Sequence, residues 1–254
     1  MVWGARPLVL VVFVAAWILY VEIGRLPSYF LPHPFAVAGK FAELALNGTL
    51  LKHARATVTE AVLGFALGSA AAICIGTLIS RSRLLELTLK PYIVASQTTP
   101  IVVLAPLFLV WFGFGLLSKI LIAAIICFFP LLVNVMAGLG SVGEQERQLF
   151  RSLEASAWQT FVRLEIPRAL PFIFAGLRIT CVLSIIGAVV GEFVGAHAGL
   201  GYLALTAAGN LETEVMFASV ITLMLLGVAF YALVSLAEAR VLFWSDGAAR
   251  RGDR

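Results

Sequence analysis

Charged and chemically reactive side chains are scarce in this sequence. Asp, Glu, Lys and Arg together make up only 13% of its 254 residues, whereas 61% of the residues are hydrophobic. The only aspartates are Asp246 and Asp253, and the three histidines lie far apart, at positions 33, 53 and 197. We therefore expect no pair of carboxylates and no cluster of histidines within the apolar part of the chain. This makes an integral-membrane enzyme the weakest function class.

The sequence also lacks clustered cysteines and a phosphate-binding loop. The three cysteines, Cys74, Cys127 and Cys181, are widely separated in apolar segments, so they predict neither a disulfide framework nor a metal site. His197 stands alone in a glycine-rich loop, where a histidine is more often hydrogen-bonded or solvated than bound to a metal. No Gly-x-x-x-x-Gly-Lys-Ser/Thr motif occurs, so the chain lacks an evident means of binding nucleotide phosphates.

Long apolar runs are what the sequence does contain. A helix needs about 20 mostly apolar residues to cross the hydrocarbon core of a bilayer. Six segments are candidates for such spans: 7–23, 58–79, 92–112, 116–139, 170–190 and 215–236. Because the loops between them are short, we predict an all-α integral membrane protein in which residues 1–254 form a single transmembrane domain. The first run follows Arg6 as a secretory signal would, but no small-residue cleavage site follows it, so we retain it as a span.

Basic residues are distributed unevenly over the loops between these spans. With the N-terminus inside the cell, 12 of the 18 Lys and Arg residues fall in cytoplasmic segments, as the positive-inside rule requires. The outer loop at 192–214 has no Lys or Arg. We therefore predict that both termini are cytoplasmic. In the first outer loop, apolar residues three or four apart over 34–48 predict an amphipathic helix on the outer surface.

The cytoplasmic loop at about 140–168, between the fourth and fifth predicted spans, is amphipathic. From residue 151 the chain reads RSLEASAWQTFVRLEIPRALPFIFAGLR. The apolar residues of the loop indicate a partner surface, and an ordinary solvated surface helix is the alternative. They are Leu149, Phe150, Leu153, Trp158, Phe161 and Leu164. Pro167 and Pro171 predict that this helical unit ends before the fifth span begins.

The same loop resembles the Glu-Ala-Ala loop in the permeases of binding-protein-dependent ABC importers. The family pattern puts Glu-Ala-Ala first, a glycine six residues after the Glu, and an Ile-x-Leu-Pro close. Leu164, Ile166 and Pro167 match that ending with Ile and Leu exchanged. Gln148 stands where Glu-Ala-Ala begins, and Glu154 stands where the turn glycine is expected. Either the two short helices are joined differently here, or that position does not require a positive φ.

Two further stretches extend the resemblance over most of the chain. SQTTPIVVLAPLFLVWFGFG at 96–115 and GEFVGAHAGLGYLAL at 191–205 are similar to segments of the nitrate/sulfonate/taurine branch of these permeases. Within that branch, the Gln-Thr-Thr-Pro form most resembles permeases for vitamin-related heterocycles, such as riboflavin or pyrimidine precursors of thiamine.

The resemblance implies a fold and a set of partners. The fold is that of a type I ABC importer permease with six transmembrane helices, embedded in the bacterial inner membrane. A second copy of the chain and two ATPase subunits, which carry ATP and Mg, complete the transporter; the chain itself holds no cofactor and no nucleic acid takes part. A periplasmic or extracellular binding protein delivers a small solute: a heterocyclic vitamin precursor, a sulfonate or a similar organic anion. The residues implied to couple to the ATPase are Gln148, Phe150, Arg151, Ser152, Leu153, Glu154 and Trp158.

Polar side chains within the spans are candidates for the solute path, because polar groups at membrane depth are costly unless they face a cavity or a partner helix. The candidates are Gln97, Thr98, Thr99, Asn134 and Ser184. The first three precede Pro100, which would bend the third span towards the path. A satisfied interhelical hydrogen bond is the alternative for each candidate. We expect Glu192 to gate the outer exit or to contact the binding protein, with a plain helix-end carboxylate as the alternative.

A self-contained channel or secondary transporter is the runner-up function. Secondary transporters usually contain two related halves with broken helices and buried ionisable residues for ion coupling. Six predicted spans without evident inverted repeats argue against that class. Arg178, about two turns into the fifth span, is expected to be a structural anchor more than a solute ligand.

Overall fold

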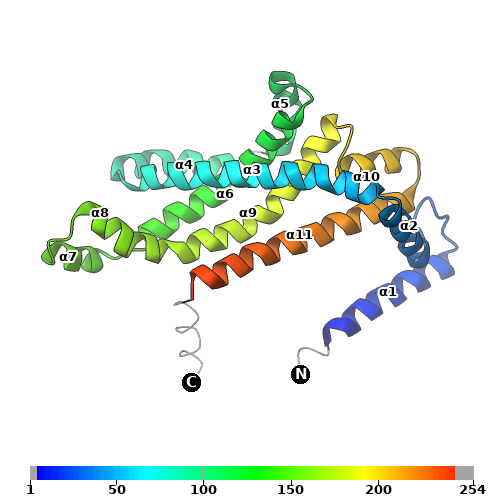
Figure 1. The fold of residues 1–254 in the computed structure, drawn as a ribbon, viewed down its shortest axis with the longest axis horizontal. Coiled ribbons are helices and arrows are strands. Elements are labelled where there is room, and N and C mark those ends of the chain that lie inside the picture. Colours follow the sequence, from blue (N-terminus) through cyan, green and yellow to red (C-terminus); the bar gives the residue numbers. More distant parts are fainter. Residues whose placement is uncertain (1–4, 99, 244–254) are drawn as a thin grey trace.

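The computed structural model describes residues 5–98 and 100–243, and every regular element in this part of the chain is a helix (Figure 1). The elements are, in chain order, α1 (Ala5–Gly24), α2 (Pro34–Leu46), α3 (Thr49–Ser80), α4 (Arg83–Thr98), η1 (Ile101–Leu104), α5 (Ala105–Phe112), α6 (Leu116–Gly140), α7 (Glu144–Ser152), α8 (Ala157–Thr160), η2 (Phe161–Glu165), α9 (Ile166–Gly195), α10 (Leu200–Gly209) and α11 (Thr213–Val241). Here η1 is a 3₁₀ turn and η2 is a π-helical turn. The predicted class, an all-α membrane protein, is confirmed.

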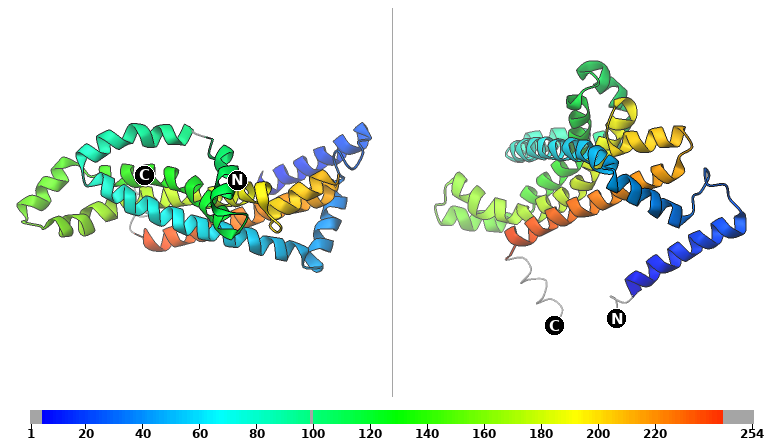
Figure 2. Two further views of the ribbon diagram at one scale, coloured as in Figure 1. Left: turned by 90° about the horizontal axis from the view of Figure 1, so that it is seen from above. Right: turned by 45° about the vertical axis from the view of Figure 1, so that its right-hand side comes forward.

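Three long helices, α3, α6 and α9, form the centre of the molecule, and α11 packs against α9 (Figure 1). At one end of this bundle lie α2, α10 and the C-terminal end of α1 (Figure 1, Figure 2). At the other end lie α7 and α8, and α5 projects from the bundle between the two ends. We refer to these as the α10 end and the α7 end.

Small residues allow α6 to lie very close to both α3 and α9. A Cβ atom added at Gly68 of α3 would overlap the carbonyl oxygen of Ala124 in α6. One added at Gly187 of α9 would lie 2.6 Å from the Cα atom of Ala123, and one at Gly64 would also overlap Ala123. Lipid gives helices little hydrophobic reason to associate, so close packing of this kind is a main source of association. The glycines therefore hold α6 between α3 and α9.

Four of the six predicted spans are confirmed as long apolar helices. Among the described residues, α3, α6, the continuous helix Ala157–Gly195 and α11 are each long and apolar enough to cross a membrane. The span predicted at 92–112 is bent, as Pro100 predicted: two helical segments meet there at 82°, and counted as one broken span they raise the number to five. The segment predicted at 7–23 is helical in α1. Within the described residues, however, its apolar stretch Val11–Gly24 is shorter than a full span.

The prediction that Pro167 and Pro171 end the helix before the fifth span is wrong. The elements α8, η2 and α9 run on as one helix of 39 residues, Ala157–Gly195. Pro167 stands in the first turn of α9, directly after the π turn, whose shifted hydrogen-bond pattern accommodates it. The chain leaves the helical conformation earlier, at 153–156, between α7 and α8.

Two smaller predictions are confirmed. The amphipathic helix predicted at 34–48 is α2, which buries Val37 and Leu44 and ends before Gly48, at φ +79. Arg178 of α9 is an anchor: its Nη1 atom lies 3.1 Å from Oε2 of Glu238 in α11. This ion pair joins the two helices through their side chains and satisfies two charges within long apolar segments.

We predict that Gly68→Ala destabilises the folded protein, because even one methyl group would force α3 away from α6. Overpacking of this kind typically costs about 1–3 kcal/mol. The matched control is Gly39→Ala on the exposed side of α2, where an added Cβ meets nothing within 4 Å. That control should be neutral or slightly stabilising, because alanine favours helix more than glycine does. Thermal unfolding in detergent measures both, and equal midpoints for the two variants would contradict the close α3–α6 contact.

Candidate functional site

Three ionisable side chains meet inside the bundle near its α10 end. The Nζ atom of Lys119, in the first turn of α6, lies 3.0 Å from Oε1 of Glu60 in α3. Glu60 and Glu192 of α9 are each 1% exposed, Lys119 is 7% exposed, and the two carboxyl groups lie near enough to interact electrostatically. Charges at such a depth are tolerated only when they are paired or hydrogen-bonded. The ion pair and the hydrogen bonds within this cluster therefore stabilise the three buried side chains where they meet.

Glu192 fastens the turn between α9 and α10 to α3. Its Oε1 atom accepts a hydrogen bond from the hydroxyl of Thr57 at 2.6 Å, and its Oε2 atom accepts one from the N–H of Gly201 at 2.5 Å. The N–H of Leu200 donates to Oγ1 of Thr57 at 2.8 Å. Gly199, at φ +129, lies so close to the carboxyl group of Glu192 that a Cβ atom there would overlap it. Only glycine fits this turn.

This cluster corrects one expectation and bears on another. No carboxylate pair was expected in the apolar segments, yet Glu60 and Glu192 come together because α3 and α9 both pack on α6. Glu192 is buried, so in this conformation it does not reach a docked protein, and its role in gating stays a prediction. Neither Glu60 nor Lys119 is among the predicted site residues. The available signal was a charge of each sign within the first few residues of the predicted spans 58–79 and 116–139.

At the opposite end, the turn between α7 and α8 closes α7 in a Schellman motif. The N–H of Glu154 donates to the carbonyl of Arg151, and the N–H of Ala155 donates to that of Phe150, both at 3.0 Å. Glu154 adopts φ +54, the left-handed conformation that glycine normally supplies. The position therefore does require a positive φ, contrary to one of the two alternatives drawn from the sequence, and a glutamate adopts it.

Large apolar side chains remain exposed around this turn. Leu149, Leu153 and Trp158 are 58%, 68% and 70% exposed. The residues predicted to couple to an ATPase all lie on this loop, and Phe150 alone among them is half-buried. Clustered exposed apolar side chains are typical of a protein interaction site. The loop thus presents an apolar surface that another protein can cover.

An arginine–glutamate group ties this loop to the central helices. The buried carboxylate of Glu165, in η2, lies 2.9 Å from Nη1 of Arg147 in α7 and 4.0 Å from Nη1 of Arg81 at the end of α3. The guanidinium of Arg81 also stacks over Phe161, 4.0 Å from the ring centroid. Residues from α3, α7 and η2 are therefore joined at one point beneath the exposed loop.

Of the polar residues predicted before Pro100, the structure places one. Gln97 is exposed near the end of α4, next to the bend into η1 and α5. Thr99 and the side chain of Thr98 lie outside the described residues. The bend predicted at Pro100 is present, and it carries α5 away from the bundle (Figure 1). Gln97 therefore lies on a part of the protein that the central helices do not cover.

The other two path candidates make hydrogen bonds within their own helices. The Nδ2 atom of Asn134, which is partly buried in α6, donates to the carbonyl of Pro130 at 2.8 Å. The hydroxyl of Ser184, fully buried in α9, donates to the carbonyl of Cys181 at 2.8 Å. In this conformation Ser184 is closed to a passing solute. Both side chains are therefore hydrogen-bonded, as the alternative to a role in the path required, but to their own helix and not to a neighbouring one.

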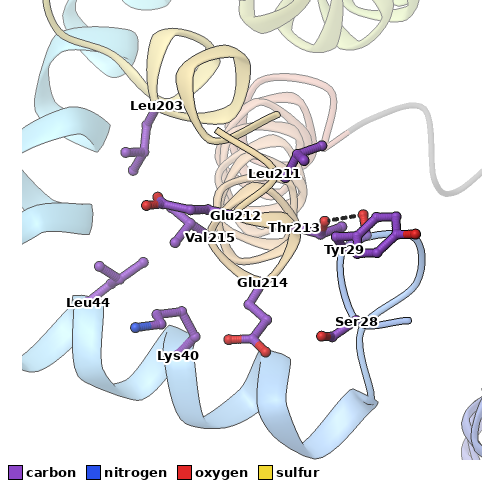
Figure 3. Close-up of a pocket in the computed structure, with 10 residues that line it drawn as sticks. All are labelled: Ser28, Tyr29, Lys40, Leu44, Leu203, Leu211, Glu212, Thr213, Glu214 and Val215. Atoms are coloured by element: carbon purple, nitrogen blue, oxygen red, sulfur yellow. Dashed lines mark hydrogen bonds between the residues drawn. The ribbon is translucent and has the colours of Figure 1, made fainter. Parts of the chain in front are cut away.

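A pocket of about 550 Å³ opens at the α10 end, between α2 and the start of α11 (Figure 3). Its lining residues are Ser28, Tyr29, Lys40, Leu44, Leu203, Leu211, Glu212, Thr213, Glu214 and Val215. The Nζ atom of Lys40 donates to Glu43 at 2.7 Å, and this hydrogen bond raises the pKa of Lys40. Both signs of charge line the pocket, so it has no marked preference for an anion.

Among the described residues, no three His, Cys, Asp or Glu side chains converge as a metal site requires.

Relatives of this chain are found among transport permeases. It is 37% identical over 238 residues to the riboflavin transport system permease protein RibX of Chloroflexus aurantiacus, covering 94% of this chain and 89% of the relative. It is 35% identical over 216 residues to the formylaminopyrimidine transport permease protein ThiX of Halalkalibacterium halodurans, covering 85% and 86%. The putative aliphatic sulfonates transport permease protein SsuC of Bacillus subtilis is 33% identical over 244 residues, covering 96% and 88%.

Solved structures and a sequence family agree with these relatives. The inward-facing MetNI methionine ABC transporter has a TM-score of 0.60 at 21% identity, over 73% of this chain and 91% of that one. An amino acid ABC transporter with histidines has a TM-score of 0.64 at 19% identity, over 78% and 97%. These two likenesses concern the fold alone. Residues 64–243 match the family described as the binding-protein-dependent transport system inner membrane component. The chain belongs to this family and is a permease subunit of an ABC importer.

Proposed function

We propose that this permease passes a small heterocyclic vitamin precursor, a sulfonate or a similar organic anion that a binding protein delivers at the α10 end. The solute class is supported by three relatives, whose names specify riboflavin, formylaminopyrimidine and aliphatic sulfonates. In this proposal the α7 end faces the cytoplasm, and both termini are cytoplasmic. The positive-inside distribution of Lys and Arg supports this orientation.

The observation that carries the coupling mechanism is the exposed apolar loop at the α7 end. Leu149, Leu153 and Trp158 leave apolar area uncovered, and Glu165 beneath them joins the loop to α3. We propose that an ATPase subunit covers this surface, and that ATP and Mg²⁺ are held by that subunit. Closure of the ATPase would then displace the loop, and the Glu165 group would carry the displacement to the central helices.

We also propose that two copies of the chain face one another with α4 and α5 at the shared path. The support is the exposure of this part of the protomer: Gln97 is exposed, and Val103, Val110 and Trp111 are 70%, 80% and 62% exposed. A symmetric pair would enclose between the protomers a passage that one copy leaves open. Two ATPase subunits, one for each loop, follow from that symmetry.

Uptake by the purified components tests the function. Proteoliposomes that contain the permease, its ATPase and its binding protein should accumulate riboflavin, a formylaminopyrimidine or an aliphatic sulfonate only when ATP is present. We expect that vesicles with the permease alone will not take up the solute, because this chain has no nucleotide-binding loop with which to use ATP. Uptake by the permease alone would instead favour a channel or a secondary transporter.

Cysteine chemistry at position 97 tests the paired arrangement. In a chain with Cys74, Cys127 and Cys181 changed to alanine, Gln97→Cys should form cross-links between two copies through a short bifunctional thiol reagent. Labelling by a membrane-impermeant thiol reagent should also change when ATP is added. Ser184→Cys is the buried control and should neither cross-link nor label. A Gln97→Cys chain without cross-links, and with the same labelling in every nucleotide state, would place Gln97 outside the path.

Leu153→Ala should weaken binding of the ATPase subunit. Full burial of a leucine is worth on the order of 1.5–3 kcal/mol, which corresponds to roughly a tenfold or greater loss of affinity. Arg151→Ala should cost less, because its ion pair with Glu144 is exposed on both sides. Leu46→Ala is the matched control, since Leu46 is 89% exposed on α2 at the other end. Co-purification and substrate-stimulated ATP hydrolysis measure the effect; wild-type values for Leu153→Ala would mean that the loop is a solvated connector.

A further inference from the structure

A basic pocket of about 470 Å³ lies at the α7 end, outside the exposed apolar surface of the loop. It is bounded by the end of α3, the start of α4, the end of α6 and one side of α7. Four arginines line it, accompanied by two glutamates, Glu86 and Glu144. The arginines are Arg81, Arg83, Arg147 and Arg151. The pocket therefore has an excess of positive charge.

The arginines differ in how far their charges are already neutralised. Arg81 and Arg147 share the carboxylate of Glu165, and Arg151 lies 3.5 Å from Glu144. Arg83 is exposed and has no ion pair within the described part of the chain. A guanidinium presents several N–H donors in a planar arrangement that suits the oxygens of a phosphate. Arg83 is thus the side chain with most capacity to bind an added phosphate.

An apolar groove of about 250 Å³ continues from this pocket between α4 and α6. The pocket and the groove share three lining residues, Glu86, Met136 and Gly140. Beyond them the groove is lined by Lys90 and by four apolar residues: Ile93, Val94, Val133 and Ala137. A ligand that fills both spaces must carry an anionic head and an aliphatic chain. A soluble phosphate would fill only the first.

We propose that this pocket and groove bind an anionic phospholipid of the leaflet at the α7 end. The phosphate would lie at Arg83 and one acyl chain would lie between α4 and α6. Basic pockets between transmembrane helices on the cytoplasmic side suit such headgroups. The bound lipid would contact two helices: α7, which belongs to the exposed loop, and α4, which leads to Gln97. The helix α7 lies at this end of the protein, and α4 begins there (Figure 1). Only the choice of leaflet rests on the proposed orientation.

Native mass spectrometry of the full-length permease in detergent tests the proposal. After delipidation, dioleoyl phosphatidylglycerol is added back in parallel with dioleoyl phosphatidylcholine. We expect selective retention of phosphatidylglycerol, and Arg83→Gln should reduce this retention about fivefold or more. Arg163→Gln is the matched control, because Arg163 is also an exposed arginine but lies in η2 and does not line the pocket. Equal retention of both lipids, or no difference between the two variants, would overturn the proposal.

A second pair of measurements separates a lipid from a soluble anion. Ala137→Leu should obstruct the groove and reduce phosphatidylglycerol retention while leaving Arg83 unchanged. Inorganic phosphate at millimolar concentration should compete only weakly, since it gains nothing from the groove. Full displacement of the lipid by phosphate, with no effect of Ala137→Leu, would mean that the pocket is a site for a soluble anion. None of these measurements requires transport or an ATPase, so failure of the proposed function would leave their result unaffected.

Discussion

The contact of α6 with α3 on one side and α9 on the other is the constraint on which the rest of this structure depends. Gly68 and Gly187 have no Cβ, so the helix backbones approach through glycine and alanine. This approach brings Lys119, at the start of α6, within reach of Glu60 and places Glu192 nearby. The buried charges at the α10 end therefore depend on small residues deeper in the bundle.

The two ends of the bundle are fixed by different interactions. At the α10 end, Glu192 is fully enclosed and accepts hydrogen bonds from α3 and from the first turn of α10. At the α7 end, Glu165 joins Arg81 and Arg147, but the loop above it keeps its apolar side chains exposed. Close-packed interiors do not deform continuously. A displacement applied to the loop would accordingly move the central helices together, as the proposed coupling requires.

Local sequence patterns predicted much of this molecule, and they failed where packing overrides them. Apolar length identified four spans as helices, although the helix of the fifth predicted span begins at Ala157, within the loop predicted at 140–168. The bend at Pro100 followed from proline chemistry, but its size of 82° did not. Pro167 was expected to end a helix and instead follows a π turn within a continuous one. The missing information in both cases is what neighbouring helices do to the freed backbone groups.

The sequence by itself determined that this protein lies in a membrane, that it is helical and to which family it belongs. Apolar run length, basic residues in loops and short motifs are all local properties. Only the tertiary structure decided which polar residues meet. Glu60 and Lys119 are 59 residues apart in the chain, and Thr57 and Glu192 are 135 apart. It also showed that Glu154 takes the left-handed conformation of a glycine. No local pattern specifies which polar residues meet, since those distances exist only after α3, α6 and α9 have packed.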